Sequence, residues 1–418
     1  MMIKKINNCR VCKNENIIPF FDLGEHPLAN RLLTKQFDKE FKYPLSLSWC
    51  SKCNLVQLNH TVSPEVLFSD YVWVTSTSSS ARDYAELFCQ KVFSHAKNIE
   101  TFSYVLEIAS NDGTFLKPFI NKGVQVFGVD PAKNIVDIAN KNGVPTTCGF
   151  WNETLANEII SEKGSPSVII ARNVLPHVAD INNFVKAIRI ASKKETLMAF
   201  EVHYAGKILN ELHYDSIYHE HLCYFSIKSL EKILNKHKIF IHDLFESPIS
   251  GGSIVALAGT YQRNKSLYLK DFEKNEHLNQ INAFDKWNDF SKLAYDHKQI
   301  LLDIILHEIK SGSKISGYGA SARSSTLLNF CEINSNHMKI IADQNALKHN
   351  KYTAGSNVLI DAPEKMMSEN PDIIFILAWN FLHEICDNLI NKYKYQKKII
   401  TPFPHPPKII DIKEVLND

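Results

Sequence analysis

The stretch SYVLEIASNDGTFLKPF, from Ser103 to Phe119, decides the fold of this chain. Within it, Tyr104 to Ile108 is a short apolar strand, Ala109 to Gly113 is a turn of small residues, and an amphipathic helix is predicted from Thr114 onward. A strand, a small-residue loop and a helix place backbone N–H groups and a helix N-terminus beside a ligand. The loop lacks the GxGxxG spacing of dinucleotide folds, which argues against NAD.

Two further apolar strands follow, and polar residues stand at their ends. The strand in VQVFGVD ends at Asp130, and the strand at Ser167 to Ala171 is followed by Asn173 and His177. An acidic residue at the end of the second strand can accept hydrogen bonds from both ribose hydroxyls. Ligands of open α/β sheets bind at the carboxyl ends of the strands. We therefore expect these three side chains and that of Glu107 to converge on one nucleoside crevice.

Downstream, a strand at Thr196 to Val202 leads into YDSIYHEHLCYFS, residues 214–226. This segment contains no Lys or Arg and gathers groups that can exchange protons: Tyr218, His219, Glu220, His221 and Tyr224. Any single histidine here is more simply explained as a buried, hydrogen-bonded residue. Burying so many titratable groups together costs energy that packing alone does not recover, which favours a functional cluster.

The C-terminal half repeats the order of strand, small-residue loop and helix in SKISGYGASARSSTLLNF, residues 313–330. Backbone amides of this loop, with Arg323 and the hydroxyls of Ser321 and Ser324, suit a pyrophosphate. Further strands are predicted in MKIIAD, PDIIFILAWN and KKIITPFP. We predict a second doubly wound domain, with a purely structural α/β domain as the alternative. Between the two halves, residues 265–309 are charged and helical in period, which predicts a connecting helical segment.

Four of the nine cysteines form two CxxC pairs, Cys9 with Cys12 and Cys50 with Cys53. Four thiolates complete a closed tetrahedral zinc site with no open position, so we expect a structural zinc ion. A redox CxxC would need one pair beside a βαβ unit and would leave the other pair unexplained. The odd cysteine total and the CxxC spacing indicate reduced thiols rather than disulfides.

The length and net charge of the chain restrict the number of its domains and the kinds of partner it binds. A chain of 418 residues is expected to form two or three domains. Its net charge of +2 gives no general reason for attraction to nucleic acid or to a membrane surface. The first residues lack the apolar region of a secretion signal, and no apolar run is long enough to span a bilayer. We expect a cytoplasmic protein.

Eleven blocks occur in one order: CRVC, LGEHPLANRL, YPLSL, CSKCNLVQL, EIASNDGTFL, GVDPAKN, NVLPH, IYHEHLCYFS, GGS, GYGASARSSTLLN and AWNF. In this order the chain resembles, over essentially its full length, the sugar C-methyltransferases that act on nucleotide-linked keto sugars in deoxysugar biosynthesis. The resemblance implies an α/β chain with three parts. These are a four-cysteine zinc-binding domain at 1–75, a central Rossmann-like class I methyltransferase domain at 76–245, and a second Rossmann-like domain at 246–418 that binds the nucleotide sugar.

The resemblance also implies a role for each matching position. The zinc ligands would be Cys9, Cys12, Cys50 and Cys53. S-adenosylmethionine would be held by Glu107, Ala109, Ser110, Asn111, Asp112, Gly113, Asp130 and Asn173. The catalytic residues would be His221, favoured as the base, with Tyr218, Glu220 and His177. The nucleotide-diphospho sugar would be bound by Trp73, Gly319, Ser321, Arg323, Ser324, Asp343, Trp379 and Asn380.

The implied reaction removes a proton from the carbon beside a ketone, which needs a base and donors that stabilise the enolate oxygen. Tyr218 or His177 could be that donor. O- or N-methylation of a nucleotide sugar, and a non-catalytic nucleotide-sugar-binding scaffold, are the alternatives. We expect a monomer that binds neither nucleic acid nor membrane.

The chain departs from the family pattern at three places. Trp73 stands where the family usually has a tyrosine. The usual HGGSxR becomes Ser250 to Val255 and loses a histidine and an arginine, and the usual PG becomes Ala354 and Gly355. The first two positions could border the sugar or its phosphates, so they bear on substrate identity more than on methyl transfer.

Overall fold

The computed structural model describes residues 3–68, 74–96, 99 and 102–416 of the chain. Among these residues, no helix has the length and apolar character needed to cross a membrane. The chain forms two compact units, each assembled from three separate segments. The first unit comprises Met1–Pro19, Ser48–Gly206 and Leu222–Phe284, and the second comprises Phe20–Leu47, Lys207–His221 and Asp285–Asp418. The three domains expected from the sequence, divided at residues 75 and 245, stay a prediction.

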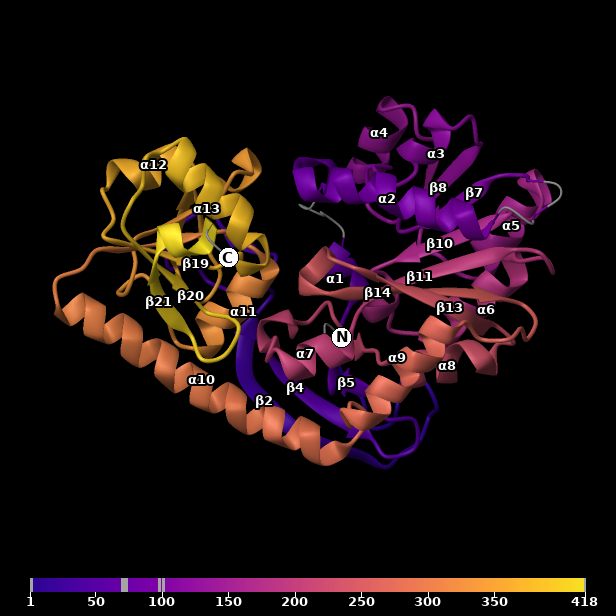
Figure 1. The fold of residues 1–418 in the computed structure, drawn as a ribbon, viewed down its shortest axis with the longest axis horizontal. Helices are drawn as coiled ribbons and strands as arrows, with labels where there is room; N and C mark the ends of the chain where they lie inside the picture. The colour runs from indigo at the N-terminus through magenta and orange to yellow at the C-terminus, as the bar shows by residue number, and fades with distance from the viewer. Residues whose placement is uncertain (1–2, 69–73, 97–98, 100–101, 417–418) are drawn as a thin grey trace. The chain divides into compact units, whose positions relative to one another are not determined.

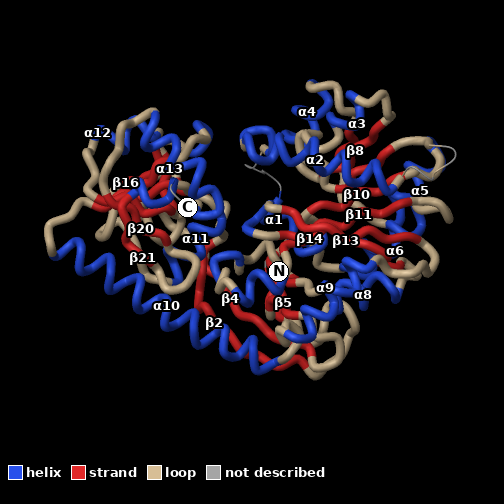
Figure 2. Tube along the Cα trace, in the orientation of Figure 1, coloured by secondary structure: helices blue, strands red, loops and turns tan. Residues whose placement is uncertain are grey.

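The first unit contains a seven-stranded sheet in the order β13-β14-β11-β10-β7-β8-β9. Its strands are β7 (Val105–Ile108), β8 (Val126–Asp130), β9 (Thr146–Cys148), β10 (Val168–Arg172), β11 (Leu197–His203), β13 (Phe240–Ser247) and β14 (Ser253–Gly259). Strands β7 to β11 pair in parallel, whereas β14 runs antiparallel to both of its neighbours, β11 and β13. The carboxyl ends of β7, β8 and β10 therefore lie side by side, as the sequence predicts. Figure 2 shows β10, β11, β14 and β13 of this sheet in red, one after another.

The helices of this unit are α1 (Pro64–Phe68), α2 (Ser79–His95), α3 (Lys117–Asn121), α4 (Lys133–Lys141), α5 (Glu153–Lys163), α6 (Ile181–Ala191), α8 (Ile227–Lys236) and α9 (Leu267–Leu278). Figure 1 shows α2, α3 and α4 grouped beside β7 and β8. The short helix α7 (Ala205–Asn210) begins in this unit and continues into the second.

Helix α2 shows how the apolar pattern builds the core. Ser78 caps it, because its hydroxyl accepts an N–H of the first turn. Tyr84, Phe88 and Val92 recur at helical spacing and are buried against the sheet. The ring of Phe88 meets Phe115 edge-on at 5.6 Å. Burying one side chain of this size contributes about 1.5–3 kcal/mol, so this face fixes α2 on the sheet.

The helix after β7 differs from the prediction. It was expected from Thr114, but α3 begins at Lys117 and has five residues. Pro118 stands in its first turn, where a proline lacking an N–H is tolerated. The preceding residues form turns, with the Leu116 N–H donating to the Gly113 carbonyl at 2.9 Å. The small-residue loop is consequently longer than expected.

The N-terminal part of the chain contributes two smaller sheets. A two-stranded sheet pairs β1 (Ile3–Lys5) with β6 (His60–Val62). A four-stranded sheet has the order β12-β5-β4-β2. Its strands are β2 (Ile17–Pro27), β4 (Lys42–Cys50), β5 (Val56–Leu58) and β12 (Cys223–Tyr224). In the chain, Leu222 separates strand β12 from the YHEH residues.

The second unit has an eight-stranded sheet in the order β21-β20-β19-β15-β16-β18-β17-β3. The strands are β3 (Leu32–Leu33), β15 (Ile315–Tyr318), β16 (Ile340–Ala342), β17 (Lys351–Thr353), β18 (Leu359–Asp361), β19 (Ile373–Ile376), β20 (Lys398–Thr401) and β21 (Lys408–Asp411). Strands β15, β16, β18, β19 and β20 are parallel, which confirms the predicted second doubly wound sheet.

The helices of the second unit are α10 (Phe284–Lys310), α11 (Ala322–Phe330), α12 (Pro363–Ser368) and α13 (Leu382–Asn391). Helix α10, the long orange helix of Figure 1, begins at the last residue of the first unit. Together with α9 it confirms the helical segment predicted at residues 265–309. The core of this unit packs β15, β16, β19 and β20 against α13.

Candidate active site

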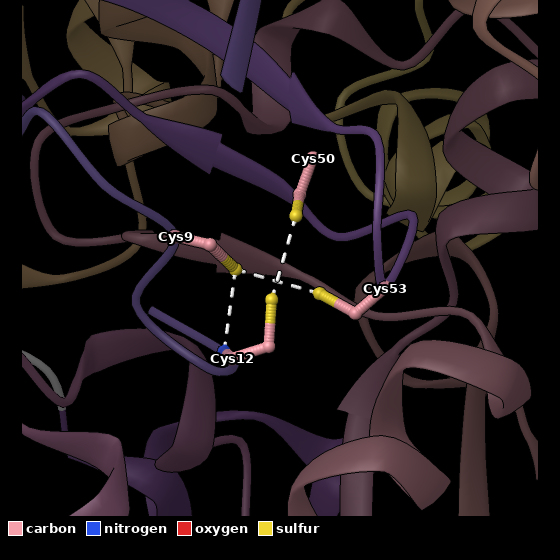
Figure 3. Close-up of side chains that lie close together, drawn as sticks. All are labelled: Cys9, Cys12, Cys50 and Cys53. Atoms are coloured by element: carbon pink, nitrogen blue, oxygen red, sulfur yellow. Dashed lines mark hydrogen bonds between the residues drawn. The ribbon is translucent and has the colours of Figure 1, made fainter. Parts of the chain in front are cut away.

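The four predicted zinc ligands lie together in the first unit. Their sulfur atoms all lie within 4.8 Å of one another, with Cys9 and Cys53 at 3.4 Å and Cys12 and Cys50 at 3.6 Å (Figure 3). Four thiolates at the usual Zn–S distance of ~2.3 Å around one ion lie ~3.8 Å apart, so the cluster fits tetrahedral zinc. All four positions are protein sulfurs, which makes this a structural metal site.

A buried arginine fixes the first CxxC loop. The Arg10 N–H donates to Gln57 Oε1 at 2.8 Å, and its guanidinium donates to the carbonyls of Leu58 and His60, both at 3.1 Å. Because these acceptors lie on β5 and β6, Cys9 and Cys12 are held against the strands that follow the second CxxC pair.

The predicted cofactor loop after β7 has an unusual backbone. Ala109, Asn111 and Gly113 have φ values of 57°, 50° and 79°. A left-handed alanine is uncommon and persists only where surrounding structure enforces it, often at functional sites. Gly113 is required for a second reason, since a Cβ there would lie 2.7 Å from Val144. The backbone N–H groups of this loop donate within the protein, that of Ser110 to the Val129 carbonyl and that of Gly113 to the Ser110 carbonyl, both at 3.1 Å, so hydrogen bonds hold the loop in this conformation beside β8.

Asp130, at the end of β8, holds this loop. Its Oδ2 accepts the Asn111 N–H at 2.9 Å, and its Oδ1 accepts the Ala132 N–H at 2.9 Å. The sequence predicts that Asp130 binds ribose. Each of its oxygens already accepts one backbone hydrogen and has a further lone pair for a hydroxyl.

The hydroxyl-rich residues before α2 also contact the loop. Asn111 Oδ1 accepts the N–H of Thr75 at 2.9 Å and its hydroxyl at 3.0 Å, and Asp112 Oδ2 accepts the Ser76 N–H at 3.1 Å. Two of the predicted cofactor residues therefore orient the chain that precedes α2. Trp73 lies just before this contact and outside the described residues.

A buried ion network surrounds Glu107. Arg172 lies 3.8 Å from Glu107 and 2.6 Å from Glu201, and its guanidinium stacks on the Phe115 ring at 3.0 Å. Burial raises the pKa of Glu107 to about 8, although Arg172 opposes the shift. Among the described residues, Glu107 Oε2 has no hydrogen-bond partner although it is fully buried. An acceptor in that state fits a donor supplied by a bound nucleoside.

Asn173 and His177 follow β10. Asn173 has a φ of 49°, and its N–H donates to the Glu201 carbonyl at 2.8 Å. His177 ends a single 3₁₀ turn, Leu175–His177. The N–H of Leu222 donates to the Pro176 carbonyl at 2.6 Å, so the chain that leaves the YHEH residues is anchored beside this turn.

In the second unit, Tyr218 and His221 form a hydrogen-bonded pair. The Tyr218 hydroxyl lies 2.7 Å from His221 Nε2, and His221 Nδ1 lies 2.8 Å from the Ser216 carbonyl oxygen. A carbonyl oxygen only accepts, so Nδ1 carries the hydrogen and neutral His221 has its lone pair on Nε2. Tyr218 is then the donor to Nε2.

His219 and Glu220, which stand between Tyr218 and His221 in the chain, contact residues 20–47, a segment that we call the N-terminal arm. Asn30 Nδ2 donates to Glu220 Oε1 at 2.6 Å. His219 Nε2 lies 3.2 Å from the Tyr43 carbonyl, and the two rings meet edge-on at 5.9 Å. Burial raises the pKa of Glu220 to about 7, and the Asn30 hydrogen bond partly opposes the rise. His219 is thereby explained as a structural residue.

The side chains of the predicted pyrophosphate loop make contacts within the second unit. Arg323 makes a bidentate pair with buried Asp215, at 2.9 Å from Nε and 2.7 Å from Nη2, and stacks over Trp379 at 4.6 Å. Trp379 Nε1 donates to the same carboxylate at 2.7 Å. The Ser321 and Ser324 side chains form a capping box at the start of α11. These groups are thus engaged within the protein.

Gly319 and Asp343 shape this loop. A Cβ on Gly319, whose φ is 97°, would lie 2.3 Å from the Ala378 Cβ, so only glycine fits. Asp343 Oδ2 accepts the Ala320 N–H at 2.9 Å, and Oδ1 accepts the Asn345 N–H at 2.9 Å. This repeats the arrangement of Asp130 in the first unit. Asn380 lies in the 3₁₀ turn Trp379–Phe381, after β19.

Four residues that contact candidate site residues in the structure were not predicted from the sequence: Asn30, Arg172, Glu201 and Asp215. Asp215 stands in the opening letters of the YHEH stretch, and Asn30 in the LGEHPLANRL block, so both positions carried a signal. Asn30 is 190 residues from its partner Glu220, and Asp215 is 108 residues from its partner Arg323, which no local pattern reveals.

The site and the sheet order define a class of protein. A sheet in the order β9-β8-β7-β10-β11-β14-β13, with β14 reversed, is the arrangement of class I methyltransferases. Three family models match consecutive parts of the chain: a zinc-binding domain at 9–68, a methyltransferase domain at 80–237 and a C-methyltransferase C-terminal domain at 248–404. The chain is therefore a methyltransferase with S-adenosylmethionine and a structural zinc ion as its cofactors.

Individual relatives agree with this class. C-methyltransferase NovU of Streptomyces niveus is 28% identical over 423 residues, covering 99% of each chain. A ubiquinone biosynthesis O-methyltransferase of Bartonella tribocorum is 28% identical over 95 residues, 22% of this chain and 38% of the relative. Magnesium protoporphyrin IX methyltransferase of Synechocystis is 12% identical and covers 43% of this chain and 79% of its own, with a TM-score of 0.33, a likeness too weak to bear on the assignment.

Proposed function

We propose that the protein transfers a methyl group from S-adenosylmethionine to the carbon beside the ketone of a nucleotide-diphospho keto sugar, through an enolate. The observation that carries the proposal is the Tyr218–His221–Ser216 chain of hydrogen bonds. It supplies a neutral imidazole with a fixed tautomer and an adjacent hydroxyl donor. The near full-length relation to a protein named as a C-methyltransferase supports transfer to carbon.

The cofactor supplies an electrophilic methyl group. In the proposal, the loop from Glu107 to Gly113 holds it, with Asp130 on the ribose and Asn173 nearby. The buried, unshared Oε2 of Glu107 and the left-handed loop backbone support this placement. In the proposal, the four-cysteine site does not take part in cofactor binding, because its metal ion stabilises the fold.

The residues around His221 perform the proton transfer. Before substrate binds, the Tyr218 hydroxyl donates to Nε2 and occupies the base's lone pair. The ketone oxygen of the bound sugar competes for the hydrogen of the Tyr218 hydroxyl, and substrate binding then has two effects. Tyr218 then donates to the oxygen that becomes the enolate, and Nε2 is released to take the proton from the neighbouring carbon. His177 is the second candidate donor to that oxygen.

The second doubly wound sheet supports a nucleotide-linked acceptor. Its first loop, from Gly319 to Ser324, leads into a capped helix, and Asp343 holds the loop as Asp130 holds the cofactor loop. The amides of Gly319, Ala320 and Ser321 already donate within the protein. We therefore propose that the first turn of α11 receives the diphosphate, and that Arg323 contributes charge while it stays paired with Asp215. The remaining residues that we propose bind the sugar substrate are Trp73 and, after β19, Trp379 and Asn380. The protein would act as a monomer in the cytoplasm, without nucleic acid or membrane.

The test is to incubate the protein with methyl-labelled S-adenosylmethionine and a panel of nucleotide-linked keto sugars. We expect one sugar to gain one methyl group, which NMR places on the carbon beside the carbonyl. A methyl group on oxygen or nitrogen would refute the enolate route. Absence of transfer to every sugar, with the cofactor bound, would refute the nucleotide-sugar acceptor.

A further inference from the structure

We propose that Asn30 of the N-terminal arm is a positioning residue that orients Glu220 and favours its ionised form. This inference rests on the proposed function, because it concerns the residue next to the proposed base. The contact that carries it is the 2.6 Å hydrogen bond from Asn30 Nδ2 to Glu220 Oε1. It joins residues 190 positions apart, so the arm reaches the YHEH segment through the fold and not through neighbouring sequence.

The surroundings of Glu220 make this donor important. The Glu220 side chain is 3% exposed, and burial favours its neutral form. Among the described residues, Asn30 is the side chain that donates a hydrogen bond to Glu220, and an amide hydrogen stabilises a carboxylate more than a carboxylic acid. The amide of Asn30 therefore counteracts the effect of burial on this side chain.

The arm is built to hold Asn30 in place. Asn30 lies in the turn after β2, where the Arg31 N–H donates to the Leu28 carbonyl at 3.1 Å. The following strand, β3, pairs with β17 through Leu32 and Leu33. A second contact, from the Tyr43 carbonyl to His219, fixes the residue before Glu220. The carboxylate is thus oriented from a rigid support.

An ionised Glu220 suits the proposed reaction. When His221 takes a proton from the substrate it becomes a cation, and a carboxylate on the preceding residue stabilises that charge. A neutral Glu220 gives no such stabilisation. Asn30 acts on this step through Glu220 and does not itself touch the substrate.

The direct test is an NMR titration of the Glu220 carboxyl carbon in glutamate-labelled protein. Its resonance is identified as the one missing from Glu220→Gln. We expect Asn30→Ala to raise the pKa of Glu220 by about 1 unit, because an interaction that favours the charged form is lost. Asn30→Asp, which is nearly isosteric and places a second carboxyl beside the first, should raise it at least as much. An unchanged pKa in both variants would overturn the proposal.

The same variants have a kinetic signature. Since Glu220 ionises as the pH rises through about 7, the acidic limb of kcat/KM should move to higher pH in Asn30→Ala. The shift should vanish when Asn30→Ala is combined with Glu220→Gln, and a shift that persisted there would overturn the proposal.

A matched control separates positioning from general damage to the arm. Gln36 Nε2 donates to the Asn357 carbonyl at 3.1 Å, a contact between the same arm and the same unit that does not involve Glu220. Gln36→Ala should leave the Glu220 titration unchanged. Because the titration needs no sugar, it stays informative if methyl transfer to keto sugars fails, so the two proposals fail separately.

Discussion

His221 can accept a proton only at Nε2, because its Nδ1 hydrogen is donated to the Ser216 carbonyl. This hydrogen bond uses a backbone oxygen, so no side-chain substitution removes it. Tyr218 supplies the other partner, and the two ring centroids lie 4.0 Å apart. In the proposed reaction the pair acts as one acid–base unit, so changes to either member should affect the chemical step.

We expect His221→Ala to lower kcat at least ~100-fold, because the base is lost, while the affinity for S-adenosylmethionine stays nearly unchanged. Turnover is measured with the accepted keto sugar, and cofactor affinity by calorimetry. The control is His95→Ala, which removes an exposed histidine paired with Asp243 on another part of the chain. A near-normal rate in His221→Ala would remove His221 from the mechanism.

The short 3₁₀ turn Tyr214–Ser216 and helix α11 are joined through the carboxylate of Asp215. Asp215 is completely buried and accepts hydrogen bonds from both Arg323 and Trp379. Thr326 on the same helix adds a hydrogen bond to the Ile217 carbonyl at 2.8 Å. These contacts tie the chain that carries Tyr218 and His221 to the loop and helix of the second sheet.

Asp215→Asn should therefore destabilise the protein by about 3–5 kcal/mol, since it leaves the guanidinium of Arg323 without a compensating charge in a mostly buried position. Urea unfolding measures the loss. Adding Arg323→Met to Asp215→Asn should recover part of it, because the unpaired charge is removed. If the two substitutions destabilise additively, the pair is not coupled and Asp215 does not link these elements.

The elements with long, regular patterns were predictable from the sequence. Strands β7, β8, β10 and β11 and helix α10 lie where the apolar pattern places them, because each buries a continuous or periodic apolar face. Helix α9 also lies in the predicted segment, although its buried residues are Leu269 and Glu276. The start of α3 was wrong by three residues, since Pro118 limits it. Strands of two or three residues, such as β3 and β17, have too few positions to show a period.

The composition of the two compact units could not be read from the sequence. Residues 20–47 and 207–221 belong with the C-terminal segment, although both are neighbours of first-unit segments in the chain. Contacts such as Asp215 with Arg323, and the pairing of β3 with β17, create this association. The cysteine cluster, in contrast, was predictable to the residue, because CxxC spacing encodes its own geometry.

Cys50→Ser should lose the zinc ion and most of the soluble yield, because the binding energy of a structural zinc site, ~10–16 kcal/mol in small domains, is also folding energy. Metal analysis of the purified protein measures the ion content. Cys148→Ser, at an exposed cysteine outside the cluster, is the matched control and should keep both. A well-folded, metal-free Cys50→Ser protein would contradict the structural assignment.

The measurement that tests the enolate account most directly is the fate of the hydrogen beside the ketone. The accepted nucleotide-linked sugar is prepared with deuterium on that carbon, and the product is analysed by mass spectrometry and NMR. Transfer through an enolate predicts a product that has gained the methyl group and lost the deuterium from the same carbon. A methylated product that retains the deuterium would contradict it.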